Sequence, residues 1–262
     1  MNAARSFRLA FVFTAFLVAC PEFVAADTSE QAVASTLRTI FSPRRAPAQR
    51  TMGLSQRSFL DLVEQSPARL EIALVIDGTE SMGPALVGVR EAISQMMADL
   101  DRYKQQEVAY QIVVFRDVGA PSGEVVYLLE EDGNRFTTDR QAVLAALSGL
   151  QVEIGAPYFP ELVDEGVHAA LSALAWSTGD EASRWIFLFA DAPPFDPTFR
   201  EESTGARRRF ATDALIAIAS ENQILINCVL CPTRVEDEVV SARVVDQTRT
   251  FLNSLSSGTG GL

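Results

Sequence analysis

Apolar and polar segments alternate along the chain in a pattern that predicts strands and helices in turn. Five apolar runs of strand length lie at residues 72–76, 108–115, 125–129, 185–190 and 224–230. Helical spacing, with apolar residues every three or four positions, marks residues 86–100, 138–150, 161–175, 207–220 and 239–256. Because strands mostly alternate with helices, we expect an α/β fold with a doubly wound, mostly parallel, Rossmann-like sheet and helices on both faces.

The first apolar run ends in a polar motif suited to a metal ion. Asp77, Thr79 and Ser81 follow the run at positions i, i+2 and i+4. In extended backbone this spacing points the three oxygen-bearing side chains in the same direction. Mg²⁺ takes oxygen ligands of this kind, and open α/β sheets bind ligands at the carboxyl ends of their strands. The motif therefore predicts half of the coordination shell of a hard cation.

The overall charge makes one class of partner unfavourable. The 262 residues carry a formal net charge of −12. An acidic chain repels the phosphate backbone, and no stripe of basic residues with interleaved aromatics is present, so we expect no nucleic-acid partner. The single histidine, His168, excludes a histidine-rich zinc site.

The N-terminus has the features of a signal peptide, which predicts an exported protein, periplasmic or secreted. Two arginines precede an apolar stretch at residues 9–19 that is too short to span a bilayer. Small residues before position 27 predict a signal peptide of residues 1–26. A lipoprotein signal of residues 1–19, with Cys20 lipidated and anchored to the membrane, is the alternative, and a retained N-terminal anchor is a third reading. Residues 27–68 then form an N-terminal extension or linker before a domain at residues 69–262.

Two cysteines lie outside the signal region, at the end of the fifth apolar run. Cys228 and Cys231 would meet an oxidising compartment in an exported protein, where a disulfide is possible. Residues three apart on a regular strand face opposite sides, so a bridge would need a bend. A structural disulfide and two unlinked thiols both stay open. A redox centre is disfavoured, because such pairs begin a helix rather than end a strand.

The motifs, taken in order, resemble a von Willebrand factor A domain over roughly residues 69–262. Residues 77–81 match the D-x-S/T-x-S motif of the metal-ion-dependent adhesion site of that family. Residues 187–194 are similar to the apolar strand and D-A-P-P motif of a bacterial branch. Supporting pieces stand at residues 115–117, 136–137, 160–161 and 258–261.

This resemblance implies a six-stranded sheet with one antiparallel edge strand and a divalent cation, Mg²⁺ or Mn²⁺, at its edge. The residues that match the metal ligands of the family are Asp77, Thr79, Ser81 and Asp191. Further residues that could contact and orient those ligands are Asp117, Glu161 and Tyr158. For Asp117, a turn-forming role is the alternative.

The chain departs from the family pattern in three places. Tyr158 stands where Thr or Asp is usual, and a phenol with a pKa of about 10 is a poor Mg²⁺ ligand. Glu80 replaces a glycine inside the motif, and the chain stops where a sixth strand and last helix are expected.

The resemblance also implies a function, namely an exported adhesion or scaffolding module rather than an enzyme. Its cation would recognise a protein ligand that presents an Asp or Glu carboxylate. One alternative is a metal-assisted hydrolase or non-catalytic enzyme subunit, since a metal with an open position activates water. Another is a scaffold with a degenerate metal site.

Overall fold

The computed structural model describes residues 69–101, 107–129, 134–154, 160–180, 182–195, 210–232 and 238–262. The expected signal peptide at residues 1–26, its lipoprotein alternative at Cys20, the extension at residues 27–68 and Tyr158 all lie outside these segments. The described strands are β1 (Arg69–Asp77), β2 (Glu107–Phe115), β3 (Val125–Tyr127), β4 (Ala182–Ala190) and β5 (Ile224–Leu230).

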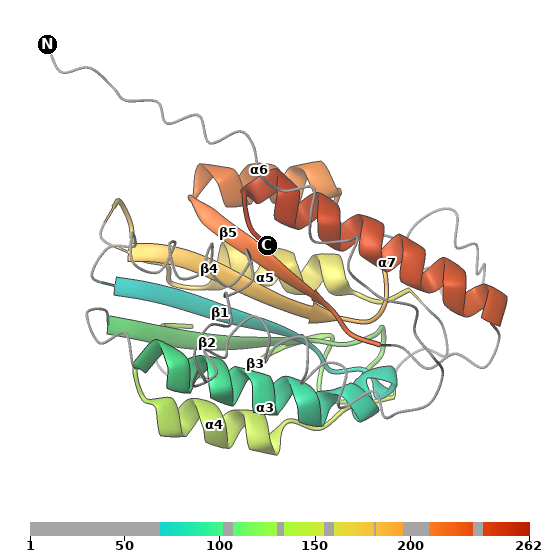
Figure 1. The fold of residues 1–262 in the computed structure, drawn as a ribbon, viewed down its shortest axis with the longest axis horizontal. Coiled ribbons are helices and arrows are strands. Elements are labelled where there is room, and N and C mark those ends of the chain that lie inside the picture. Colours follow the sequence, from blue (N-terminus) through green and yellow to red (C-terminus); the bar gives the residue numbers. More distant parts are fainter. Residues whose placement is uncertain are drawn as a thin grey trace, which may run out of the picture.

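The strands form one twisted sheet in the order β3-β2-β1-β4-β5 (Figure 1). β1 pairs in parallel with both β2 and β4, and β4 pairs in parallel with β5. Only β3 runs antiparallel, along three residues at the edge beside β2. The structure therefore confirms the mostly parallel, Rossmann-like α/β fold and its single antiparallel edge strand.

Helices cover both faces of the sheet. They are the short 3₁₀ helix η1 (Glu80–Met82), α3 (Gly83–Leu100), α4 (Arg140–Gly149), α5 (Val163–Ala173), α6 (Thr212–Glu221) and α7 (Glu238–Thr259). α3 and α4 pack on one face, while α5, α6 and α7 pack on the other (Figure 1). Along β1, Ile72, Leu74 and Ile76 enter the first core, and Ala73 and Val75 enter the second. A strand buried on both faces needs a continuous apolar run, which explains the pattern in the sequence.

Two helix starts differ from the expectation. α4 is capped by Asp139, whose carboxylate accepts hydrogen bonds from the backbone N–H groups of Gln141 at 2.8 Å and Ala142 at 3.1 Å. We expected the helix from Thr138. α5 begins at Val163 rather than at Glu161, and the Glu161 N–H donates to the carbonyl of Pro193 at 3.0 Å. That bond ties Glu161 to the segment that follows β4.

The six-stranded sheet implied by the resemblance is not seen, since the sheet of the described residues has five strands. Instead, α7 follows β5 and ends where Gly260 adopts a φ of 79° and the Gly261 N–H bonds to the Ser256 carbonyl at 2.9 Å. The chain then runs along the outer edge of β5, where the Cys228 N–H donates to the Leu262 carbonyl at 2.8 Å. The glycines at the end of the chain thus stop a helix.

None of the helices in the described segments has both the length and the apolar content to cross a membrane.

Candidate metal centre

Three chain segments each bring a carboxylate to the end of the sheet at which the parallel strands have their C-terminal residues. Asp77 is the last residue of β1, and Asp191 follows directly after the neighbouring strand β4. Glu161 comes from the segment before α5 and forms an isolated parallel bridge with Pro194. The sheet order and this bridge place the three residues together, although they are far apart in the sequence.

The three carboxylates lie close to the spacing at which they could share one ion. One oxygen from each of Asp77, Glu161 and Asp191 lies within 4.8 Å of the other two. In an octahedral Mg²⁺ shell with oxygens at about 2.1 Å from the ion, opposite oxygens are about 4.2 Å apart. The side chains are almost entirely buried, with exposures of 0% for Asp77, 3% for Glu161 and 0% for Asp191. We call these three residues the carboxylate triad.

The two hydroxyls of the motif connect the members of the carboxylate triad. Thr79 donates to Asp77 Oδ1 twice, from its backbone N–H at 2.9 Å and from its hydroxyl at 2.7 Å. The Ser81 hydroxyl lies 3.0 Å from Thr79 Oγ1, 3.2 Å from Asp191 Oδ1 and 3.5 Å from Glu161 Oε1. All four residues that match the ligands of the adhesion site therefore lie together, with Glu161 among them.

The carboxylate triad has more negative charge than the surrounding protein groups satisfy. Asp77 Oδ2 and Glu161 Oε2 are buried and accept no hydrogen bond from the described residues. No arginine or lysine in the described segments forms an ion pair with Asp77 or Glu161. Burial raises the pKa of Glu161 well above its usual 4.5, and the charges of Asp77 and Asp191 raise it further. Three such groups need a proton or a cation between them, so the residues present fit a hard divalent ion.

The remaining residues that the sequence singled out lie elsewhere or form no part of the carboxylate triad. Asp117 is buried just after β2, where its side chain accepts from the Val118 N–H at 2.7 Å and its carbonyl accepts from the Ala120 N–H at 3.2 Å. These bonds are those of a turn. His168 lies on α5 with its ring stacked on that of Phe210, at 3.6 Å between centroids.

Cys228 and Cys231, for which the sequence left a disulfide open, are free thiols in the structure. Cys228 packs against the core under α5, α6 and α7, whereas Cys231 packs into the core under α3 and α4. The two side chains thus lie on opposite faces of the sheet. Burial, followed by the charges of Asp191 and Asp77, raises the pKa of the Cys231 thiol well above its usual value, so the thiol stays protonated beside the carboxylate triad.

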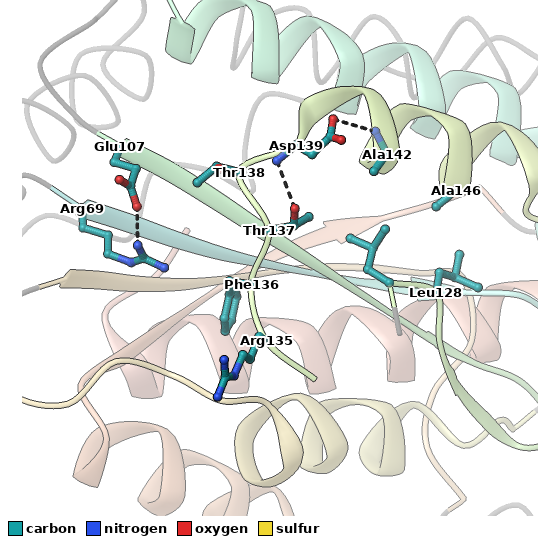
Figure 2. A pocket seen from close by; sticks show the side chains of 11 residues that line it. Arg69, Glu107, Leu128, Arg135, Phe136, Thr137, Thr138, Asp139, Ala142 and Ala146 are labelled. Carbon is teal, nitrogen blue, oxygen red and sulfur yellow. Dashed lines mark hydrogen bonds and ion pairs between the residues drawn. The ribbon is translucent and has the colours of Figure 1, made fainter. Parts of the chain in front are cut away.

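A surface cavity of about 860 Å³ lies apart from the carboxylate triad, and several of its polar groups are engaged with one another (Figure 2). Arg69 pairs with Glu107 across one wall, and Asp139 is occupied by capping α4. The Thr137 hydroxyl accepts from the Asp139 N–H at 3.0 Å. None of the three triad residues lines this cavity. The unsatisfied oxygens therefore favour the triad, rather than the cavity, as the functional site.

Comparison with known proteins does not assign the chain to a family. No protein-family model matches the chain, so membership of the von Willebrand factor A family stays a prediction. No curated protein matches it either. Among solved structures it is similar to the pilus adhesin SpaC from Lactobacillus rhamnosus GG in its open conformation, with 12% identity and a TM-score of 0.48. The match covers 74% of this chain and 27% of the adhesin chain, and similarity at this level is no guide to activity or partner.

Proposed function

We propose that this chain is an exported binding module of the von Willebrand factor A type, in which a divalent cation takes part in binding a protein partner. The observation that carries the proposal is the buried carboxylate triad, in which oxygens of Asp77 and Glu161 lack hydrogen-bond donors among the described residues. The motif resemblance supports the same reading. Export, through a signal peptide at residues 1–26 or a lipid anchor at Cys20, is part of the proposal.

The ligand set favours Mg²⁺ or Mn²⁺ over softer metals. Asp77, Glu161 and Asp191 offer carboxylate oxygens, and Thr79 and Ser81 offer hydroxyl oxygens. No histidine or cysteine of the described segments joins the group of ligand atoms. Hard cations take such all-oxygen shells, whereas zinc and copper sites usually include nitrogen or sulfur.

Binding accounts for the site better than hydrolysis does. A metal-assisted hydrolase needs a general base within hydrogen-bonding reach of the activated water, in addition to the metal ligands. Of the two glutamates that could act as this base, Glu161 belongs to the proposed ion site itself, and Glu80 is exposed to solvent. A degenerate scaffold is disfavoured too, because a decayed site would not keep three buried carboxylates together.

Metal-dependent capture tests this function. The full-length chain would be immobilised and exposed to envelope proteins of its own source, in Mg²⁺ and in EDTA. We expect specific proteins to bind in Mg²⁺ and to be lost in EDTA and with Asp77→Ala. Asp180→Ala is the matched control. Asp180 is exposed in the turn before β4 and therefore lies at the N-terminal ends of the parallel strands, opposite to the carboxylate triad. Capture that ignores both EDTA and Asp77→Ala would contradict the proposal.

A further inference from the structure

The proposed cation centre holds one more carboxylate than the motif resemblance assigns to it. The resemblance assigns two carboxylates, Asp77 and Asp191, to the ion. In the structure, a carboxylate oxygen of Glu161 also lies within 4.8 Å of an oxygen of each of these two residues. Resting on the proposed cation site, we propose that Glu161 is itself a ligand of the ion and that the open position of this centre therefore selects an uncharged oxygen over a carboxylate. A hydroxyl or carbonyl oxygen of the partner is the group that fits.

Glu161 is held in place by backbone contacts as a ligand would be. Its N–H bonds to the Pro193 carbonyl at 3.0 Å, and its bridge to Pro194 ties it to the segment that begins with Asp191. Its side chain is 3% exposed, and its Oε2 accepts no hydrogen bond from the described residues. A buried carboxylate that lies close to two others, and that has an oxygen without a donor, is satisfied when a cation lies between them.

The third carboxylate changes the charge of the loaded centre. Two carboxylates balance a divalent cation, and a third leaves the loaded site with an excess negative charge. Partner carboxylates approaching within a few ångströms of a buried negative charge are repelled, since Coulomb energies are larger in the protein interior than in water. Uncharged oxygens have a dipole that the cation still attracts, and they bring no added charge.

The third carboxylate also fills the shell. Three carboxylate oxygens together with the hydroxyls of Thr79 and Ser81 make five donors. An octahedral ion then keeps about one position for water or a partner atom. A single small neutral oxygen suits that position, whereas a bidentate carboxylate does not.

Mn²⁺ and two small probes of equal shape test this inference. Mn²⁺ would be bound to the full-length protein, and the relaxation rate of water protons would report the exchangeable water on the ion. Acetate and its uncharged isostere acetamide would then be titrated separately. We expect acetate to bind protein-held Mn²⁺ at least about tenfold more weakly than it binds Mn²⁺ in solution, because the site has lost the net positive charge of the free ion.

Glu161→Gln isolates the role of the third carboxylate. We expect this variant to bind Mn²⁺ at least about tenfold more weakly and to bind acetate at least about tenfold more tightly, with acetamide unchanged. Glu80→Gln is the matched control, since it removes an equal charge from an exposed residue next to Ser81 and should leave both probes unchanged.

The outcomes separate this inference from the function it rests on. Acetate binding to the wild type as tightly as to free Mn²⁺, or Mn²⁺ affinity unchanged in Glu161→Gln, would overturn the inference and leave the cation site standing. If Glu161→Gln binds no Mn²⁺ at all, Glu161 is supported as a ligand, and the wild-type acetate result decides the charge argument. No binding of Mn²⁺ by the wild type would remove the proposed function together with this inference.

Discussion

Strand β1 carries a buried carboxylate near each end, and the two are satisfied in opposite ways. Glu71, 1% exposed, accepts from Arg69 Nε at 2.9 Å and from the backbone N–H and hydroxyl of Ser177 at 2.9 and 2.5 Å. Asp77, 0% exposed, receives both of its described hydrogen bonds from Thr79 on Oδ1, while Oδ2 has no donor. Among the described residues, both oxygens of Glu71 have hydrogen-bond donors, whereas only one oxygen of Asp77 does.

The comparison separates structure from function within a single strand. The carboxylate of Glu71 has a cation and two donors around it, and it fixes the connection before β4, where Arg184 Nε also bonds to the Ser177 carbonyl at 2.6 Å. Asp77 lies instead among two further carboxylates. Buried polar groups are normally paired, so the proposed cation would supply the partner that this oxygen of Asp77 lacks among the described residues.

The largest effect on stability is expected at the Glu71 end of β1, where both carboxylate oxygens have donors within the chain. Glu71→Ala removes a buried carboxylate and leaves both half-buried Ser177 donors without their partner, which should lower the free energy of unfolding by about 3 kcal/mol. Because Arg69 is partly exposed, water compensates part of the lost ion pair. Urea denaturation would measure the loss, which should be equal in Mg²⁺ and in EDTA. A loss that Mg²⁺ restores would show that both ends of β1 belong to one site.

At the other end, Asp77→Asn should act through the cation. Saturation of the wild type at 100 times the dissociation constant adds about 2.7 kcal/mol of stability, and the variant should lose that increment. Without metal, the variant should be at least as stable as the wild type, because a buried negative charge close to Asp191 and Glu161 is gone. Thermal melts with and without Mg²⁺ would show both effects. Strong destabilisation of the metal-free variant would mean that Asp77 has a structural role like that of Glu71.

The pH dependence of the metal-free protein distinguishes the two ends further. The pKa of Glu161 is raised in the folded state by burial and by Asp77 and Asp191, so above pH 4.5 the folded chain holds a proton that the unfolded chain releases. Stability should therefore fall as pH rises from 4.5 towards the raised pKa, by up to about 1.4 kcal/mol per pH unit. Saturating Mg²⁺ or Glu161→Gln should remove this fall. If stability still falls with rising pH in Glu161→Gln, a group other than Glu161 causes the fall.

The smallest effects are expected from a matched pair of serines. Ser177→Ala removes one hydroxyl from Glu71 but keeps the backbone donor, which should cost about 1 kcal/mol in any buffer. Ser81→Ala removes one hydroxyl from the cation site and should weaken Mn²⁺ binding about tenfold while changing metal-free stability little. Denaturation curves and Mn²⁺ titrations of both variants would give the comparison. If the two variants lose the same stability and the same Mn²⁺ affinity, the two ends of β1 do not differ in the way proposed.

Local patterns in the sequence predict most of the sheet and the motif at the end of β1. Strand β1 is apolar on both faces, and Thr79 and Ser81 are close to Asp77 in the chain, so short-range spacing is enough to place them. Strand β5 was predicted over the residues it occupies, 224–230.

Features that depend on tertiary contacts were less accessible from the sequence. Glu161 reaches the carboxylate triad because its segment pairs with Pro193 and Pro194, more than thirty positions later. From the sequence, Glu161 was predicted only as a residue that could support the metal ligands, not as a member of the group of ligand atoms itself. Likewise, whether Cys228 and Cys231 bond depends on the face of the sheet that each one occupies. The position of Leu262 beside β5 follows from the packing of α7 and not from any local pattern.

The central claim is that the buried carboxylates at the end of β1 and β4 hold a divalent cation. Calorimetric titration of Mg²⁺ and Mn²⁺ into the EDTA-stripped full-length chain, beside Asp77→Ala, tests it most directly. The account predicts saturable binding of one ion per chain in the wild type and none in the variant. Absence of binding in the wild type, or equal binding in both proteins, would contradict it.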